Sequence, residues 1–419
     1  MNESKLLFSS LFNAAVAAAD PYLAVAPYLP PRPKGRTVVV GAGKGVSQLA
    51  AALEEQWDGI LSGIVVTRYG FAVPCRYIDV REAGHPVPDA NGLKASRDIL
   101  DCVRDLGEDD LVIALVTGGG SALLPAPPPG VSLEDEIALN KALLASGAPI
   151  SAMNAVRKQV SLIKGGRLAL AAWPAKVVTL VVSDIPGDAL PAVASGPTLP
   201  DEADKDAALK AISDYKMQLP ANVLAYLDKP DCAAPRPSDQ RFARNEYHMI
   251  ASARKSLEAA AAISRKQGLA TSILSDAIEG EARMVATAQA GLVRQIKTRN
   301  RPYARPVMLL SGGETTVTMK GSGRGGRNTE FLLSLALELE ELPGVEAFSA
   351  DTDGIDGTEE SAGAFIDEST LSRMRDLDLD PKSALANNDS WTVFNALGDL
   401  FSTGPTGTNV NDFRAIFVR

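Results

Sequence analysis

Short apolar runs in the first half of the chain alternate with longer segments in which apolar residues recur at helical spacing. Runs rich in β-branched residues predict strands at 36–41, 63–67, 77–80, 111–116 and 177–182. The run at 111–116 is apolar throughout, which is typical of a strand covered on both faces in a parallel sheet. Helices are predicted between these strands at 44–56, 89–106, 132–146 and 151–165. This order indicates an α/β domain.

The alternation begins again after residue 240. Strands are predicted at 247–251, 271–274, 307–310, 315–319, 345–349 and 414–418, and helices at 253–267, 281–298 and 329–341. The strands at 307–310 and 315–319 flank Ser311-Gly-Gly-Glu314 and are candidates for a hairpin. Segment 229–240 contains three prolines and few apolar residues, as linkers do. We therefore expect two α/β domains, 1–238 and 239–419, each with a largely parallel sheet.

The first residues resemble a secretory signal only superficially. Residues 6–19 are fairly apolar, but Glu3 offsets Lys5 where a signal peptide has a basic region. One helical face would carry Leu7, Leu11, Ala14, Ala15 and Ala18. We expect an amphipathic helix here, and no apolar run approaches the ~20 residues that span a bilayer. A cytoplasmic protein without a membrane partner is the expectation.

Charge and cysteine content exclude several classes of protein. Lys and Arg number 42 against 51 Asp and Glu, which gives a net charge of −9. A nucleic-acid partner is therefore not expected, because such proteins carry a basic face. The three cysteines are far apart and odd in number, so neither a disulfide framework nor a cysteine zinc site is indicated. Only two histidines occur, which excludes histidine-rich zinc sites.

Two glycine-rich loops follow predicted strands in the first half. The first contains Gly41, Gly43, Lys44 and Gly45. Val46 stands where a dinucleotide-binding fingerprint needs glycine, so the loop predicts a more general anion site made of backbone N–H groups and the lysine charge. The second loop offers backbone and hydroxyl donors from Gly118, Gly119, Gly120 and Ser121. For each loop the alternative is a plain turn.

Further polar groups follow other strands of the first half. Asp184 and Asp188 come directly after the strand at 177–182. Such a pair can hold Mg²⁺ through water and substrate phosphates, or one carboxylate can act as a general base. The alternative is a polar turn capped by Asp184. His85 also follows a strand, either as a general base or as a packing residue beside prolines.

A predicted helix in the first half carries polar groups at helical spacing. Asn154, Arg157, Lys158 and Ser161 recur three or four residues apart and therefore share one face. This face suits a carboxylate or phosphate, whereas a solvated helix face is the commoner cause of such spacing.

The second half contains a glycine-rich loop with two arginines. The segment 321–328 holds Arg324, Gly325, Gly326 and Arg327 and opens a helix. Arginine at a helix N-terminus suits the spread charge of a transferring phosphoryl group. A mobile loop with solvated arginines is the alternative.

Asp351 and Asp353 follow a strand and look like the start of a calcium loop. Counted from Asp351, the fifth, sixth and twelfth positions are Ile355, Asp356 and Ala362, which excludes an EF-hand. The two carboxylates fit a magnesium or sugar-hydroxyl site better, and an Asp-Gly turn is the alternative. Together the loops supply cations and carboxylates without a nucleophile triad, which favours phosphoryl transfer over serine hydrolysis.

The motifs and their order resemble the class II glycerate kinases, which combine a Rossmann-like N-terminal domain with a C-terminal MOFRL domain. The matching segments are VVVGAGKG, EAGHPVPD, VTGGGSALLPAPPPGVSLEDE, NAVRKQVSLIKGGRLA, VSDIPGDAL, ASGPT, SGGETTVT, GRGGRNTEF, SADTDGIDG and STGPTGTNVND. Thr329 is the one departure, since Gln is expected there. The resemblance implies ATP- and Mg²⁺-dependent phosphorylation of D-glycerate to 2-phosphoglycerate in a cleft between two α/β domains.

Residue roles follow from this resemblance and from loop placement. Lys44 and Arg327 match the positions expected to be catalytic or to stabilise phosphate. Asp184 is expected to hold the metal or to take the hydroxyl proton, and Arg157 or Lys158 to bind the substrate carboxylate. Further substrate ligands are expected at Asn154 and Glu314, and further metal ligands at Asp188, Asp351 and Asp353. Phosphate contacts are expected from Gly41, Gly43, Gly45, Gly118, Gly119, Gly120, Ser121, Gly325 and Gly326.

Two other functions stay open at this stage. Family members also carry the label hydroxypyruvate reductase, an NAD(P)H-dependent activity against which the broken dinucleotide fingerprint argues. A non-catalytic sugar-acid-binding regulator is the third class, and the number of Asp and Arg loops argues against it. A homodimer is left open.

Overall fold

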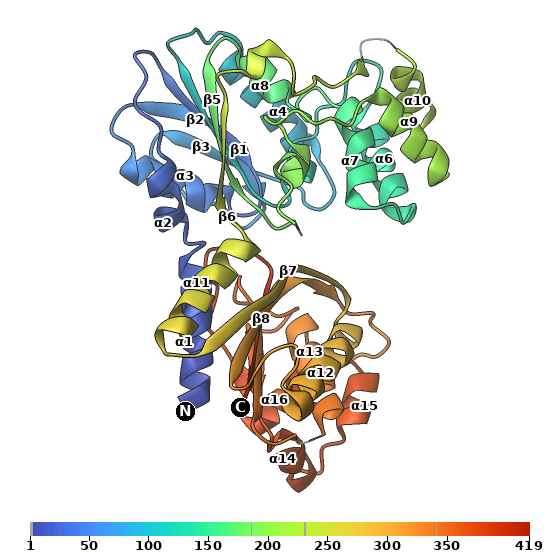
Figure 1. Cartoon of the computed structure of the whole chain (residues 1–419). Helices are drawn as coiled ribbons and strands as arrows, with labels where there is room; N and C mark the ends of the chain where they lie inside the picture. The colour runs from blue at the N-terminus through green and yellow to red at the C-terminus, as the bar shows by residue number, and fades with distance from the viewer. Residues whose placement is uncertain (1–2, 186, 230–231, 341) are drawn as a thin grey trace. The chain divides into compact units, whose positions relative to one another are not determined.

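The chain forms two compact units. The computed structural model describes residues 3–185, 187–229, 232–340 and 342–419. One unit is Pro21–Ile250, and the other combines the residues up to Asp20 with Ala251–Arg419. We call them the sheet A unit and the sheet B unit (Figure 1). Both mix helices and strands, which confirms the expected α/β class.

Sheet A has six strands in the order β3-β2-β1-β4-β5-β6. Their bounds are β1 Thr37–Ala42, β2 Leu61–Arg68, β3 Ile78–Ala83, β4 Leu111–Val116, β5 Lys176–Val182 and β6 Glu246–Ala251. The pairs β1–β2, β1–β4, β2–β3 and β4–β5 are all parallel. Every residue of β1 and β4 is buried, as their uninterrupted apolar runs predict.

Helices connect the strands of sheet A. They are α2 Pro21–Val25, α3 Val46–Gln56, α4 Ala90–Arg104, α5 Gly120–Leu123, α6 Leu133–Ala145, α7 Ile150–Gln159, α8 Arg167–Ala172, α9 Lys205–Asp214 and α10 Ala221–Leu227, with 3₁₀ turns at Ala26–Tyr28, Leu190–Ser195 and Gln240–Phe242. Asp89 caps α4 by accepting from the N–H of Gly92 at 2.9 Å. Ser132 and Asp135 form the predicted capping box of α6.

The proline-rich segment that we expected as a linker lies inside the sheet A unit. Cys232 is buried, and its carbonyl accepts a hydrogen bond from Arg167 at 2.7 Å. The N–H of Ala234 donates to Gln159 Oε1 at 2.7 Å. These contacts hold the segment against the helices, so the units divide after Ile250 instead of at 238/239. Pro230 and Asp231 of this segment lie outside the described residues.

Sheet B has the order β11-β10-β9-β12-β8-β7 and is mixed. Its strands are β7 Ala270–Glu281, β8 Val307–Thr316, β9 Val345–Asp351, β10 Gly363–Ile366, β11 Leu400–Phe401 and β12 Asp412–Val418. Only β7–β8 is parallel among the described pairs, because the C-terminal strand β12 inserts antiparallel between β8 and β9. The expectation of a largely parallel sheet is therefore wrong for this unit. β8 is also continuous through Ser311–Glu314, so the expected hairpin is not formed.

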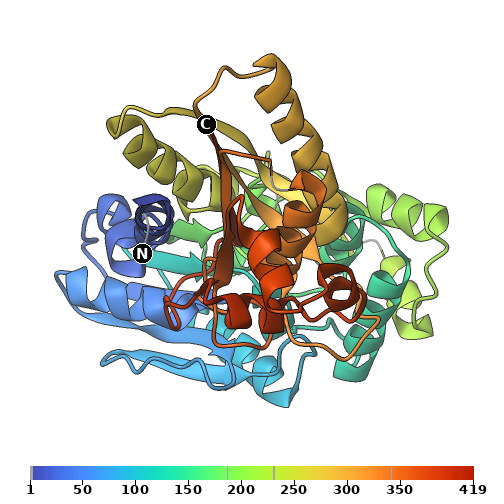
Figure 2. The same ribbon diagram turned by 90° about the horizontal axis from the view of Figure 1, so that it is seen from below.

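Helices of the sheet B unit are α1 Glu3–Ala17, α11 Ala253–Lys266, α12 Ala282–Arg299, α13 Arg327–Leu339, α14 Thr370–Asp376, α15 Pro381–Ala386 and α16 Ser390–Leu397. The predicted first helix is present as α1 and lies beside α11 (dark blue in Figures 1 and 2). The buried face of α1 carries Phe8, Leu11, Phe12 and Ala15. This face shares Leu11 and Ala15 with the predicted one but is rotated about the helix axis relative to it. Phe8 and Phe12 pack on Phe348 of β9, which explains why α1 belongs to this unit.

Taken one at a time, none of the helices in the described part of the chain is long and apolar enough to cross a membrane.

Candidate active site

Four loops carry candidate side chains at the carboxyl edge of sheet A. Parallel strands bring their carboxyl ends to one edge, and ligands bind beyond that edge in such folds. The register aligns Ala42 of β1 with Val116 of β4, and Val116 with Val181 of β5. We call the side chains and glycines that meet here the Lys44 group, which consists of Lys44, His85, Gly118–Gly120 and Asp184.

The three glycines are the centre of the Lys44 group. A Cβ atom at Gly118 would lie 1.7 Å from Asp184 Oδ2. At Gly119 it would lie 2.9 Å from His85 Nε2 and 3.0 Å from Lys44 Cγ. These distances leave no room for a side chain, so glycine is required for the lysine, the histidine and the aspartate to approach one loop. The structure thus brings together four motifs that are far apart in the sequence.

Backbone hydrogen bonds join the first two glycine loops. The N–H of Lys44 donates to Gly118 O at 2.8 Å, and the N–H of Gly45 donates to Thr117 Oγ1 at 3.2 Å. Helix α3 begins at Val46, two residues later than predicted, so Lys44 lies in the loop before the helix. Gly43 has a φ of 143° and would place a Cβ only 2.0 Å from Thr117 Oγ1. The N–H groups of Gly43, Lys44 and Gly45 are thus all bonded within the protein, so phosphate binding by the backbone of this loop stays a prediction.

His85 is neutral at pH 7 in this setting. Burial lowers the pKa of its imidazole to about 4, and the charges of Lys44 and Arg68 act in the same direction. A neutral imidazole can accept a proton or a hydrogen bond. The sequence left His85 between a catalytic and a packing role, and the structure places it beside Lys44.

A chain of hydroxyl and amide groups supports Ser121. The hydroxyls of Ser121 and Ser195 lie 2.9 Å apart, and Ser195 Oγ donates to Asn154 Oδ1 at 3.1 Å. The same amide oxygen accepts from Arg157 Nη1 at 3.2 Å. Ser195 has a φ of 59°, a strained value that is typical of functional sites. Sequence reasoning noted the segment ASGPT but did not identify Ser195, because only the fold places it against Asn154.

Lys158 does not share the environment of Arg157. Its side chain is 1% exposed and forms an ion pair with Asp201, whereas Arg157 donates to Asn140 Oδ1 at 2.8 Å. Burial lowers the pKa of both cations. Since α7 ends at Gln159, Ser161 also lies beyond the helix. The expected four-residue face is therefore wrong, and Arg157 is the better candidate of the two for an anionic substrate.

The carboxylates after β5 fit a metal that is held in part by substrate. Asp188 Oδ2 is buried without a hydrogen-bond partner among the described residues. Within the ranges that the structure describes, no three His, Cys, Asp or Glu side chains cluster as a complete metal site. Mg²⁺ is commonly bound by one or two carboxylates together with substrate phosphates. The donor set at Asp184 and Asp188 is thus chemically suitable, although Pro186 between them lies outside the described residues.

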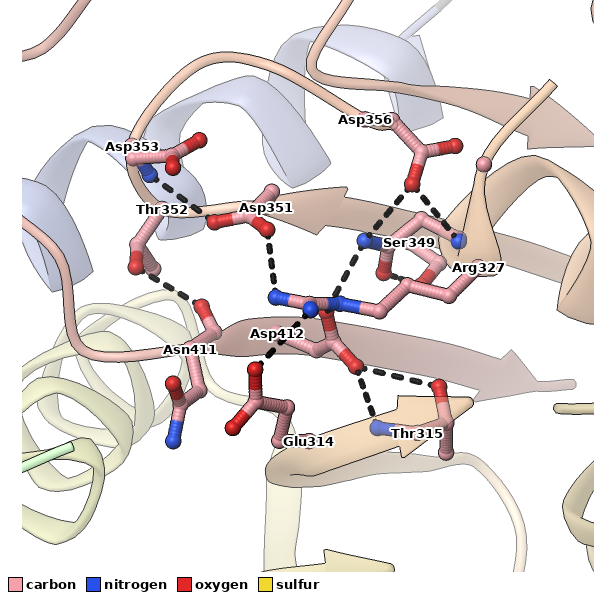
Figure 3. A network of polar contacts seen from close by, with 12 residues as sticks. Glu314, Thr315, Arg327, Ser349, Asp351, Thr352, Asp353, Asp356, Asn411 and Asp412 are labelled. Carbon is pink, nitrogen blue, oxygen red and sulfur yellow. Dashed lines mark hydrogen bonds and ion pairs between the residues drawn. The ribbon is translucent and has the colours of Figure 1, made fainter. Parts of the chain in front are cut away.

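A second group of candidates lies at one edge of sheet B (Figure 3). Because β12 runs antiparallel to β8 and β9, its start lies beside their carboxyl ends. This places Asp412 next to Asp351 and Glu314, and the first turn of α13 directs Arg327 at all three. Arg327 Nε lies 2.6 Å from Asp412, Nη2 lies 2.6 Å from Asp351 and Nη1 lies 3.1 Å from Glu314. We call these four residues the Arg327 group.

Electrostatics keep Arg327 fully charged. Burial opposes its charge, but Asp412, Asp351 and Glu314 outweigh burial and raise the pKa of the guanidinium. Burial raises the pKa of Asp351, and the positive charge of Arg327 opposes this rise. Both oxygens of Asp351 already accept hydrogen bonds, from Arg327 and from the N–H of Asp353. Metal binding by Asp351 and Asp353, and substrate binding by Glu314, therefore stay predictions.

Asp412 is the residue of this group that sequence reasoning missed. It ends the motif STGPTGTNVND and starts an apolar strand, which was the available signal. Its fully buried carboxylate accepts from Arg327, from Asn328 Nδ2 at 3.0 Å and from the N–H of Thr315 at 3.2 Å. Burial alone would raise the pKa of Asp412, but Arg414 and Arg327 lower it.

The start of α13 is capped from a distant loop. Asp356 accepts the N–H groups of Asn328 and Thr329, each at 2.9 Å, and the Thr329 hydroxyl at 2.8 Å. The threonine that departs from the family pattern is thus part of the cap. A Cβ at Gly326 would lie 2.4 Å from Asp356, so this glycine serves close packing. Phosphate binding by Gly325 and Gly326 stays a prediction, since two amides of this helix start are already bonded.

Comparisons with known proteins cover nearly the whole chain. Residues 7–228 match a family described as a domain of unknown function (DUF4147), and residues 307–412 match the MOFRL family. A D-glycerate 2-kinase from Thermotoga maritima is 40% identical over 410 residues, which is 97% of each protein. A putative hydroxypyruvate reductase from Agrobacterium vitis is 53% identical over 92% of this chain and 100% of its own length.

The fold agrees with these sequence matches. The crystal structure of a glycerate kinase from Thermotoga maritima superposes with a TM-score of 0.91 at 38% identity and covers 100% of both chains. The expected resemblance is confirmed, and the chain belongs to the glycerate kinase family with a MOFRL domain in its C-terminal part.

Proposed function

We propose that the protein transfers the γ-phosphoryl group of ATP to the 2-hydroxyl of D-glycerate and so forms 2-phosphoglycerate and ADP. The observation that carries this proposal is the meeting of Lys44, the Gly118–Gly120 loop and Asp184 at the carboxyl edge of sheet A. Full-length relatives that are named glycerate kinases support the same reaction.

The reaction needs positive charge more than covalent chemistry. The glycerate 2-oxygen attacks the γ-phosphorus, and the bond between that phosphorus and the β,γ-bridging oxygen breaks. Lys44 and Arg327 neutralise phosphate charge in this proposal, and donors of the Gly118–Gly120 loop assist them. Mg²⁺, when bound, supplies further charge neutralisation, and Asp184 and Asp188 are the residues suited to hold it.

The hydroxyl proton needs an acceptor, and the substrate carboxylate needs a cation. Asp184 is our first candidate for the proton if it does not hold the metal, and neutral His85 is the second. Arg157, whose Nη1 donates a hydrogen bond to Asn154 Oδ1, is our candidate to bind the substrate carboxylate. The neighbouring Lys158 is not, because Asp201 already pairs with it.

A reductase is the less suitable function. A dinucleotide site needs glycine where Val46 stands and an acidic residue near the end of the second strand. β2 instead ends at Arg68, which suits only the 2′-phosphate of NADP and not the ribose of NAD. Its guanidinium lies over the Phe71 ring at 3.5 Å.

A paired assay on the purified protein tests the proposal. One arm contains D-glycerate, ATP and Mg²⁺ and follows ADP, with phosphorus NMR of the product. The other contains hydroxypyruvate with NADH or NADPH. We expect ADP and 2-phosphoglycerate in the first arm, and nicotinamide oxidation without ADP would refute the kinase. Lys44→Ala should lower turnover at least ~10²-fold, whereas Lys210→Ala, in an exposed ion pair with Asp214, is the control.

We also propose that the protein works in the cytoplasm. The three cysteines are all free thiols, which supports a reducing compartment such as the cytoplasm. A homodimer stays a prediction, and light scattering during gel filtration tests it.

A further inference from the structure

Arg414 is a fully buried cation directly behind the Arg327 group. It lies two residues after Asp412 in β12, so both side chains project from the same face of the sheet. Its exposed fraction is 0%, and its Nη2 donates to Thr315 Oγ1 at 2.8 Å and to Asp412 Oδ2. Its Cζ lies 5.1 Å from the centre of the Phe331 ring.

The burial of this guanidinium by itself lowers the stability of the folded protein. Nε and Nη1 of Arg414 are buried without hydrogen-bond partners in the part of the chain that the structure describes. Burial lowers the pKa of Arg414, which Asp412 opposes. An apolar side chain of similar size would avoid the cost of desolvating this guanidinium. The position therefore retains arginine for a reason other than core packing.

The two oxygens of Asp412 face different partners. Oδ2 accepts from Arg414 and from the N–H and hydroxyl of Thr315. Oδ1 accepts from Arg327 Nε at 2.6 Å and from Asn328 Nδ2. A carboxylate held on both sides cannot rotate, so it fixes the plane of the Arg327 guanidinium. Without Arg414, three carboxylates would compete for the single charge of Arg327.

We propose that Arg414 and Asp412 are positioning residues that hold Arg327 in the orientation needed for phosphoryl transfer. The inference rests on the proposed function, in which Arg327 contacts phosphate. Arg414 keeps Asp412 ionised and immobile, and Asp412 directs Arg327 through its Nε–H. Nη1 of Arg327 then faces the partly exposed side of the group, where Glu314 is half-exposed, and Nη2 stays paired with the buried Asp351.

The test compares Arg414→Met, Arg414→Lys and Asp412→Asn with the control Arg373→Met. Arg373 also pairs with a buried carboxylate, Asp399, at 2.7 Å in the same unit, but it takes no part in the Arg327 group. We expect kcat to fall ~10–100-fold in Arg414→Met with KM for D-glycerate nearly unchanged, as for a lost transition-state donor. Arg414→Lys should restore part of kcat, since it keeps the charge but not the planar fork.

A second readout does not depend on turnover. Phenylglyoxal modifies accessible arginines, and mass spectrometry of the peptides measures the rate at Arg327. We expect faster modification of Arg327 in Arg414→Met and Asp412→Asn, and an unchanged rate in Arg373→Met. If Arg414→Met does not fold, the modification rate at Arg327 in Arg414→Lys and Asp412→Asn is compared with that in Arg373→Met instead.

The outcomes separate the two proposals. Loss of stability in Arg414→Met, with unchanged kcat for the folded fraction and an unchanged modification rate at Arg327, would overturn the positioning role. Absence of kinase activity in the wild-type protein would instead overturn the proposed function, while the modification rates would still decide whether Arg414 holds Arg327.

Discussion

Replacing Gly118 by alanine tests whether Asp184 must lie against the glycine loop. The new Cβ would lie 1.7 Å from Asp184 Oδ2 and 2.2 Å from Asp184 Cγ. An ordinary contact needs about 3.4 Å, so the carboxylate or the loop must move by ~1.7 Å. A displacement of ~1 Å at a reacting group can cost ~10²-fold in rate. The accompanying overpacking should cost ~1–3 kcal/mol of stability.

The matched control for this substitution is Gly107→Ala. Gly107 is also in the sheet A unit, and its Cβ would meet only Asp110 Oδ2, at an ordinary 4.0 Å. We expect Gly118→Ala to lower kcat for phosphorylation of D-glycerate ~10²-fold at saturating ATP, and Gly107→Ala to keep wild-type turnover. Thermal unfolding of both variants shows how much of the effect is lost folded protein. Gly118→Ala with more than half of the wild-type kcat would refute the argued role of this contact.

Three further predictions concern residues away from this loop. Phe12→Ala should lower the free energy of unfolding by ~3–5 kcal/mol in urea titrations, because the ring is 1% exposed and packs on Phe348; an effect below ~1 kcal/mol would contradict the placement of α1. Lys158→Met should lower the free energy of unfolding by ~1–3 kcal/mol, because it leaves Asp201 without its partner. KM for D-glycerate should not change. A large rise in KM would show that Lys158 binds the substrate after all. His85 has a pKa lowered to about 4, so the unfolded state binds more protons between pH 4 and 6.5. Stability should therefore rise as the pH increases from 4 to 6.5 in the wild type, and it should rise less in His85→Gln. Equal pH slopes would show that His85 is not held neutral.

The pattern of residue types along the chain predicts a site where its strands and the loops after them follow each other directly in sequence. The apolar runs of β1 and β4 and the glycines after them identify a parallel sheet and the loops at its carboxyl edge. Lys44, Gly118 and Asp184 could be selected for that reason before any contact was known. Parallel geometry alone then brings them together, because every strand of such a sheet ends at the same edge.

Sheet B shows where the pattern is insufficient. An apolar run has the same composition whether its neighbours are parallel or antiparallel, so the insertion of β12 between β8 and β9 was not predictable. The ion pair between Arg327 and Asp412 joins residues 85 positions apart and depends on that insertion. The amphipathic pattern of α1 likewise predicts a buried face but not which unit covers it.

The sequence alone predicts the α/β class, the glycine loops, the family and Lys44 and Arg327 as candidate cations of the site. These depend on local spacing and residue type. The tertiary structure decides which partners these residues have. In the folded chain Lys158 forms an ion pair with Asp201, and Ser195 donates a hydrogen bond to Asn154. Asp412 forms ion pairs with both Arg327 and Arg414. Such pairings follow from strand order and direction, which arise when distant segments bury their apolar faces together, and no local pattern specifies them.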